Sequence, residues 1–365
     1  MSVPAATGLK RLHLDKTLFY ALLVLAGLSL MVIYSATGKN LNATGAHFLR
    51  IVLGFIVLLI AAQIPPQTLE RWAPYIFAVG IALLLAVAFK GVVGKGAQRW
   101  LSLGFIRFQP SEIMKLAVPM MAAWYLSRAN LPPTWWRLAL AALVVLVPVV
   151  IIARQPDLGT AVLVAAGGFF VLFLAGMYWR VLAALAVAVA AAIPFAWQFL
   201  HDYQRKRVLT LIDPQADPLG SGYHTIQSMI AVGSGGFYGK GWLNSTQAHL
   251  EFLPESHTDF IFAVFAEEFG LIGSLLLLGV YLVIAARTLL IAYMAQDTFT
   301  RLLAGSLALT FFINFFVNMG MVTGIMPVVG IPLPIFSYGG TAVLTLMASF
   351  GVLMSIHTHR KIAEM

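Results

Sequence analysis

The chain has 365 residues, of which 60% are hydrophobic and only 10% are charged, whereas an ordinary soluble domain is about 25% charged. This composition excludes an ordinary soluble domain and indicates a membrane protein whose helices, over residues 1–365, pack as a single domain. The net charge is +9, but the basic residues are scattered between apolar runs, so no nucleic-acid groove is expected. The absence of cysteine excludes disulfides and thiolate metal sites.

The N-terminal segment resembles the charged region of a signal peptide, because Lys10, Arg11, His13 and Lys16 precede an apolar run. That run, residues 17–36, is longer than a signal-peptide core of about 7 to 15 residues and long enough to cross a hydrocarbon layer of about 30 Å. We therefore expect an uncleaved first membrane helix.

Ten apolar segments are long enough to cross a membrane as helices, which predicts an all-α polytopic fold. They cover residues 17–36, 46–64, 72–89, 111–127, 138–153, 159–176, 180–200, 259–286, 301–323 and 337–356. An even number of crossings places both termini on one side. Every connection on that side carries a basic residue, so we expect both termini, including residues 1–16, to be cytoplasmic.

Two long connections, residues 90–110 and 201–258, then lie on the outer side. The second, between the seventh and eighth helices, is rich in Gly and polar residues, as in Gly233-Ser234-Gly235-Gly236. Loops of this length are uncommon in compact folds and usually carry function. No internal repeat is evident, so a transporter built from inverted repeats has no direct support.

The densest polar stretch, residues 252–260, joins this loop to the eighth helix. Its simplest interpretation is helix capping, with Ser256 or Thr258 as the N-cap and Asp259 in the first turn. The functional alternative is a general base, in which the Asp259 carboxylate, with His257 nearby, takes a proton from a hydroxyl group. The helix dipole would lower the pKa of this base, so burial or a second carboxylate would have to offset that effect.

Several charged residues fall inside the predicted membrane helices, where a charge is costly and needs a partner. Glu267 and Glu268 are adjacent in the eighth helix and cannot both face one cavity with Asp259. Either these carboxylates have a functional role, or one of them pairs with a buried cation such as Arg50 or Lys115. Glu112 and Lys115 are three residues apart in the fourth helix, which predicts an ion pair, either as a local helix-start contact or as the support of a substrate cavity.

Two further polar turns connect helices. In residues 154–160, Asp157 either caps the sixth helix or binds a ligand. Residues 330–341 combine prolines with Ser337, Tyr338 and the pair Gly339-Gly340 at the start of the tenth helix. A helix N-terminus of this kind suits a phosphate group, and a close-packed re-entrant turn is the alternative.

In this order, the motifs resemble the SEDS family (shape, elongation, division and sporulation), which includes RodA and FtsW. The match covers nearly the whole chain: it is strongest over residues 223–270 and extends to residues 109–112, 155–160 and 337–340. The short N-terminus is closer to the RodA branch. The chain departs from the family pattern at Ser245, Val329 and Thr341-Ala342.

The resemblance implies a peptidoglycan glycosyltransferase that polymerises lipid II on the outer face of the bacterial inner membrane during cell elongation. The essential acidic position of the family falls on Asp259, and its charged pair on the fourth helix falls on Glu112 and Lys115. The implied partners are lipid II, the growing lipid-linked glycan, a class B penicillin-binding protein that acts as transpeptidase, and the elongation machinery.

We expect Asp259 to deprotonate a sugar 4-hydroxyl of the acceptor, which attacks the anomeric carbon of the donor and releases undecaprenyl pyrophosphate with inversion. The pyrophosphate needs positive side chains or a divalent cation, Mg²⁺ or Mn²⁺. The expected supporting residues are Arg107, Glu112, Lys115, Arg205, Arg207, Lys240, His257, Ser337 and Tyr338. Two alternatives stay open: a lipid II flippase that uses the intramembrane charges as a polar path, and a non-catalytic scaffold for the penicillin-binding protein.

Overall fold

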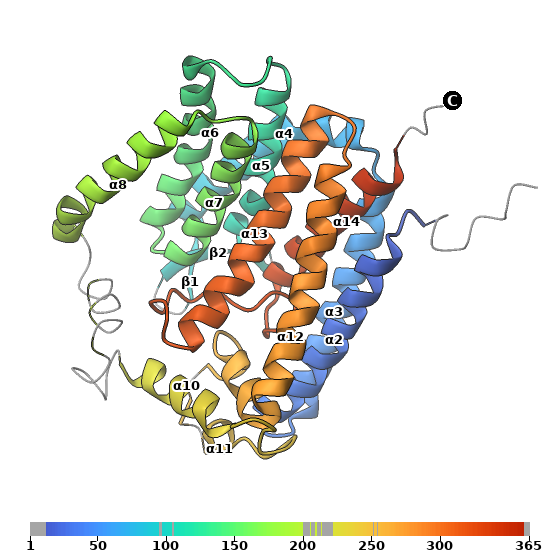
Figure 1. Ribbon diagram of the computed structural model, residues 1–365, viewed down its shortest axis with the longest axis vertical. Coiled ribbons are helices and arrows are strands. Elements are labelled where there is room, and N and C mark those ends of the chain that lie inside the picture. The colour runs from blue at the N-terminus through green and yellow to red at the C-terminus, as the bar shows by residue number, and fades with distance from the viewer. Residues whose placement is uncertain are drawn as a thin grey trace, which may run out of the picture.

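The structure, a computed structural model, describes residues 12–94, 97–103, 106–199, 205, 209, 213, 222–250, 252–253 and 255–360, which form a bundle of long helices (Figure 1). The first helices are α2 (Lys16–Ala36), α3 (Leu41–Gln63), α4 (Pro66–Lys90), α5 (Pro110–Ser127), α6 (Trp135–Arg154), α7 (Leu158–Leu174) and α8 (Trp179–Phe199). They are followed by α10 (Tyr223–Ser234), α11 (Thr246–His249), α12 (Ile261–Tyr293), α13 (Thr298–Val322) and α14 (Thr341–Thr358).

A helix coincides with each of the ten apolar segments that the sequence predicts, within several residues at either end. Seven helices in the described part of the chain are long and apolar enough to cross a membrane, namely α2, α3, α4, α6, α12, α13 and α14. The protein is therefore a mostly helical, multi-pass membrane protein. That α5, α7 and α8 also cross the membrane stays a prediction.

The two described ends of the chain lie at one end of the bundle, which we call the terminal end (Figure 1). The opposite end carries α10, α11 and the start of α12, and we call it the loop end. At the terminal end, the rings of His13 and His359 stack with their centroids 4.0 Å apart. This common position of the two ends agrees with an even number of crossings.

An ion pair between Asp15 and Arg287 joins two helices at the terminal end. Asp15 caps α2 by accepting a hydrogen bond from the Leu18 N–H, and its carboxylate lies 2.6 Å from the Arg287 guanidinium of α12. Burial raises the pKa of Asp15, but the hydrogen bonds from Arg287 and Leu18 outweigh burial and hold the pKa below its ordinary value. The carboxylate is therefore ionised at neutral pH and joins α2 to α12.

The connection 90–110, which was expected to be free of strands, differs from the all-α prediction because it forms a three-stranded antiparallel sheet in the order β1 (Val92–Gly94), β2 (Ala97–Leu103) and β3 (Ile106–Phe108). Its aromatic and β-branched residues favour strands. Arg99 of β2 donates to the Pro156 carbonyl and lies 3.7 Å from Asp157. Asp157 also accepts from the Thr160 N–H (3.4 Å) and from the Gln109 side chain (2.5 Å), so the capping interpretation of Asp157 is confirmed.

Candidate functional site

Asp259 lies, partly buried, in the turn that precedes α12. The expected capping arrangement is wrong, because α12 begins at Ile261 and its N-cap is Phe260, which makes no side-chain cap hydrogen bond. The Thr258 hydroxyl donates instead to the Glu255 carboxylate at 2.6 Å. Asp259 therefore lies before α12 and not in its first turn.

The backbone of the Asp259 turn is held by residues that follow it by 59 to about 80 positions in the chain. The carbonyl groups of residues 257, 258 and 259 accept hydrogen bonds from the Tyr338 N–H (2.9 Å), the Ser337 hydroxyl (2.6 Å) and the Asn318 amide (2.9 Å). The Asp259 carboxylate faces the connection between α13 and α14, since a Cβ atom at Gly330 would lie 3.4 Å from its Oδ2 atom. The structure thus brings Ser337 and Tyr338 onto the Asp259 turn, as a common site requires.

An open cleft of about 980 Å³ lies beside this turn at the loop end. Residues 36–40, which connect α2 and α3, line one part of it, and residues 255–257 and Tyr338 line another. His257 meets Tyr338 edge to face, with ring centroids 5.6 Å apart. A cleft of this volume is large enough to receive sugar residues.

The predicted ion pair on α5 is confirmed, with Lys115 Nζ 2.6 Å from Glu112 Oε1. The pair borders a narrow cavity of about 60 Å³ between α5, α13 and α14. Ser337, which donates to the Thr258 carbonyl, lines this cavity as well, so the cavity extends from the charged pair towards the Asp259 turn. The Glu112 Oε2 and Asn314 Oδ1 atoms are buried and lack hydrogen-bond partners among the described residues, which makes this cavity polar in part.

The other expected cations differ in their surroundings. Lys240 pairs with Glu267 at 2.6 Å, and its expected role in binding pyrophosphate stays a prediction. Arg205 is partly buried. Arg207 lies outside the described residues, and for Arg107 only the backbone, in β3, belongs to the described part.

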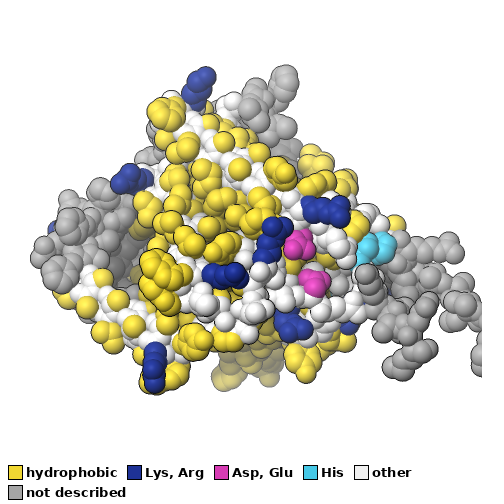
Figure 2. All heavy atoms as spheres, turned by 90° about the horizontal axis from the view of Figure 1, so that it is seen from above, with side chains coloured by type: hydrophobic (Ala, Val, Ile, Leu, Met, Phe, Trp, Pro, Cys, Tyr) yellow, Lys and Arg dark blue, Asp and Glu magenta, His cyan; other side chains and the backbone are white. Residues whose placement is uncertain are grey.

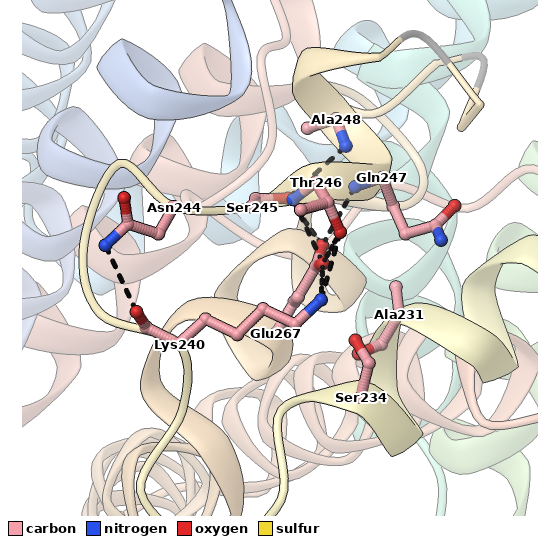
Figure 3. A network of polar contacts seen from close by, with 9 residues as sticks. All are labelled: Ala231, Ser234, Lys240, Asn244, Ser245, Thr246, Gln247, Ala248 and Glu267. Carbon is pink, nitrogen blue, oxygen red and sulfur yellow. Dashed lines mark hydrogen bonds and ion pairs between the residues drawn. The ribbon is translucent and has the colours of Figure 1, made fainter.

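Glu267 is fully buried in α12 and fastens the loop over residues 240–247 to that helix (Figure 3). Its carboxylate accepts hydrogen bonds of 2.6–3.3 Å from Lys240, Ser245, Thr246 and Gln247. Glu268, the next residue, accepts from Ser35 of α2. The expected pairing of one glutamate with a cation is therefore confirmed for Glu267, but the cation is Lys240 and not the suggested Arg50 or Lys115.

The glycine-rich loop, residues 233–241, also supplies hydrogen-bond partners to the backbone of α12 where this helix is interrupted. Gly270 has φ +64° and ψ −161°, which interrupts the helix. The carbonyls before the break accept from the N–H groups of Lys240 and Gly241 at 3.0 and 2.9 Å, and the N–H groups after it donate to the carbonyls of Gly236 and Phe237 at 2.9 and 3.1 Å. The loop therefore satisfies backbone groups that a kink leaves without helical partners.

Replacing Glu267 by Gln is expected to lower the free energy of unfolding by about 3 kcal/mol, because the partly exposed Lys240 loses the counter-charge of the fully buried Glu267 and an amide N–H₂ faces several donors. Thermal unfolding in detergent measures this loss. Glu70→Gln is the control, since Glu70 is a partly buried residue at the terminal end, and it should change stability by less than about 0.5 kcal/mol. Equal unfolding temperatures for both variants would show that the network contributes nothing.

Three polar residues near the Asp259 turn were not assigned a role from the sequence, namely Ser29, His47 and Asn318, and Arg50 was expected only as a partner of Glu267 or Glu268. Asn318 holds the Asp259 carbonyl, whereas His47 and Arg50 pack on the ring of Tyr338. The signal available in the sequence was a polar or charged residue within an apolar helix.

Known proteins resemble this chain over nearly its whole length. The "Peptidoglycan glycosyltransferase MrdB" of Escherichia coli K12 is 54% identical over 352 residues, which cover 96% of this chain and 95% of the relative. The protein of the same name from Helicobacter pylori is 36% identical, with coverage of 96% and 92%.

Solved structures show the same similarity. A structure described as "Structural coordination of polymerization and crosslinking by a peptidoglycan synthase complex" matches with a TM-score of 0.82 and 33% identity, over 94% of this chain and 97% of the other. Rod shape determining protein RodA of Thermus thermophilus matches with a TM-score of 0.72 and 26% identity, over 95% and 98%.

The family model for FtsW, RodA and SpoVE, described as "Cell cycle protein", matches residues 10–362. This match covers the bundle, the Asp259 turn and the paired charges of α5. It confirms the resemblance drawn from the motifs, and the chain belongs to the FtsW, RodA and SpoVE family.

Proposed function

We propose that this protein is a peptidoglycan glycosyltransferase that polymerises lipid II into glycan strands at the loop end of the bundle. The observation that carries this proposal is the Asp259 turn, whose backbone is clamped by Ser337, Tyr338 and Asn318 beside a cleft of about 980 Å³. Such clamping suits a catalytic carboxylate, which must be held in a fixed geometry towards its substrate. The similarity to relatives named peptidoglycan glycosyltransferase supports the same activity.

Asp259 acts as the general base in this proposal. It takes the proton of a sugar 4-hydroxyl on the acceptor while that oxygen bonds to the anomeric carbon of the donor. The bond between that carbon and the diphosphate breaks at the same time, and the diphosphate leaves with the bonding electrons. One displacement inverts the anomeric configuration, so no covalent enzyme intermediate is needed.

The leaving diphosphate needs positive charge. The Lys115 ammonium of α5 is one source, and its pairing with Glu112 holds it beside the polar cavity. No group of three or more His, Asp and Glu side chains that could hold a metal lies within the described ranges. We therefore expect a divalent cation, Mg²⁺ or Mn²⁺, to enter with the diphosphate, as Mg²⁺ commonly binds through substrate phosphates and one or two carboxylates.

The loop end faces the outside of the cell in this proposal, and the terminal end faces the cytoplasm. The face of the terminal end displays several Lys and Arg side chains and few acidic ones (Figure 2). Exposed basic residues lie in the first two turns of the helices that start there, namely Lys16, Arg71, Arg137, Arg180 and Arg301. This distribution follows the positive-inside rule for a bacterial inner membrane.

A transpeptidase is the expected partner, a class B penicillin-binding protein within the elongation machinery. The solved peptidoglycan synthase complex, whose description couples polymerisation with crosslinking, supports this partner. Crosslinking consumes the strands that the proposed reaction makes, so the two activities act in sequence.

Lipid II flipping is the competing function, and a non-catalytic scaffold is the third. A flippase would use buried charges as a path across the bundle. Two of those charges, Glu267 and Glu268, are instead engaged with Lys240 and Ser35 at the loop end, which disfavours such a path.

Polymerisation of lipid II by the full chain purified in detergent, with Mg²⁺ or Mn²⁺, tests the proposal. Without a membrane there are no two leaflets, so a flippase or scaffold yields no polymer. Glycan strands visible on a gel, formed with or without the penicillin-binding protein, support the enzyme. Lipid II movement in vesicles without any polymer, in a preparation that is folded and bound to its partner, would overturn it.

A further inference from the structure

Arg50 is a cation inside a membrane-spanning helix whose counter-charge the described protein does not supply. It lies about 13 Å along α3 from the first residue of that helix and is partly buried. Its Nη1 atom is buried, and within the described ranges it has no hydrogen-bond partner and no carboxylate forms an ion pair with the guanidinium. A partly buried charge at this depth is costly unless an anion reaches it.

The guanidinium of Arg50 is held in place by an aromatic platform. It stacks over the ring of Tyr338, with its central carbon 4.2 Å from the ring centroid. The same ring contacts His47 and His257, at centroid distances of 5.7 and 5.6 Å. His47 is fully buried and is oriented by a 2.8 Å hydrogen bond with Ser29. Arg50 therefore lies next to the residues that form the Asp259 turn.

The packing of α3 against α14 also places Arg50 near a helix start. A Cβ atom at Gly54 would touch Met347 and Val343 at 3.0 and 3.4 Å, and Gly351 packs further along α3, so the two helices run in the same direction. One turn earlier on α3, Arg50 is level with the first residues of α14. The N-cap of that helix is Gly340, which makes no side-chain cap hydrogen bond and has open space around its Cβ position.

We propose that Arg50 binds the diphosphate of a polyprenyl diphosphate, with the N–H groups at the start of α14 as further donors. This inference rests on the proposed function and adds the residue that receives the lipid-linked diphosphate. A guanidinium pairs with phosphate through two hydrogen bonds, and free helix N–H groups add to its affinity for anions. The exposed apolar surface of α3 beside Arg50, formed by Phe48, Leu49, Val52 and Leu53, suits the polyprenyl chain.

Binding of geranylgeranyl diphosphate to the purified full chain tests this inference without requiring turnover. The probe should raise the unfolding temperature in detergent, and a titration gives its Kd. Arg50→Gln should weaken binding by about 10- to 100-fold, because a charge-assisted, bidentate contact is lost. Arg50→Lys keeps the charge but loses the planar contact, so its affinity should fall between those of the parent and Arg50→Gln.

Arg71→Gln is the matched control, since Arg71 is exposed at the other end of the bundle and should bind the probe like the parent. Inorganic pyrophosphate should bind more weakly than the lipid through the same residue, and equal binding of the two would overturn the role of the polyprenyl chain. An Arg50→Gln protein that folds and binds the probe as tightly as the parent would overturn the site. If Arg50→Gln does not fold, the Arg50→Lys protein decides instead, and an affinity equal to that of the parent would overturn the site.

The same measurements separate this inference from the proposed function. Asp259→Asn protein should still bind the probe through Arg50, because the binding needs no general base. If the parent protein binds geranylgeranyl diphosphate but never polymerises lipid II, the Arg50 site stands and the proposed function is wrong. If the parent protein polymerises lipid II and Arg50→Gln binds the probe with full affinity, the proposed function stands and only the Arg50 site is wrong.

Discussion

Replacing Asp259 by Asn is expected to slow lipid II polymerisation by about 100- to 10,000-fold, because the reaction loses its general base. The fold should not suffer, since the Asp259 turn is held through the backbone carbonyls of residues 257–259 and the substitution leaves these groups unchanged. Strand formation from lipid II, measured on purified protein at matched concentration, gives the rate. The unfolding temperature in detergent checks that the variant is intact.

Asp297→Asn is the matched control for this substitution. Asp297 caps α13 by accepting a 2.9 Å hydrogen bond from the Thr300 N–H at the terminal end, and Asn caps a helix equally well. This control should polymerise lipid II at the parental rate. If Asp259→Asn does the same in a folded sample, another residue must act as the base.

Replacing Gly270 by Ala is expected to cost at least about 3 kcal/mol of stability and to abolish polymerisation. A residue with φ +64° and ψ −161° occupies a region that is open almost only to glycine. A Cβ atom there would also collide with the backbone of Gly239 and Phe237 in the loop that binds the kink. Relief of this collision requires the loop to leave α12, and this loop precedes α11 and the Asp259 turn in the chain.

Gly279→Ala in the same helix is the matched control. A Cβ atom at Gly279 would meet nothing within 4 Å, and Ala is more favourable than Gly in a helix by up to about 1 kcal/mol. This variant should therefore be as stable as the parent or more stable, with normal activity. Thermal unfolding of the two variants side by side measures the difference, and equal unfolding temperatures would contradict the structural role of the kink.

The helical bundle was largely predictable because each membrane-crossing helix must satisfy the demands of the lipid environment by itself. A membrane-crossing helix must be apolar over about twenty residues and must satisfy its own backbone hydrogen bonds, so each segment can be recognised without its neighbours. The Glu112–Lys115 pair was predictable for a similar reason, since residues three apart on a helix share a face. The sheet at residues 92–108 was missed because a short strand pair carries a weaker local signal than a helix.

The candidate site was predictable by residue type more than by arrangement. The motif residues Asp259, Ser337 and Tyr338 stood out in the sequence, and the structure joins them through backbone contacts. The partners of Glu267 were missed, because they depend on how a loop of some twenty residues folds back onto α12. The neighbours of Arg50 were missed for the same reason, since they come from the far end of the chain.

The sequence by itself determined the membrane class, the helical segments, the family and the identity of the charged residues that need partners. These properties depend on composition and on periodicities within one segment, where the physical rule is local. Only the tertiary structure decided that Lys240 is bound by Glu267, that Gly270 breaks α12, and that Arg50 lies on Tyr338 with no ion pair to a carboxylate of the described residues. Each of these contacts joins segments far apart in the chain, and such contacts form only when the packing of the whole bundle brings them within a few ångströms.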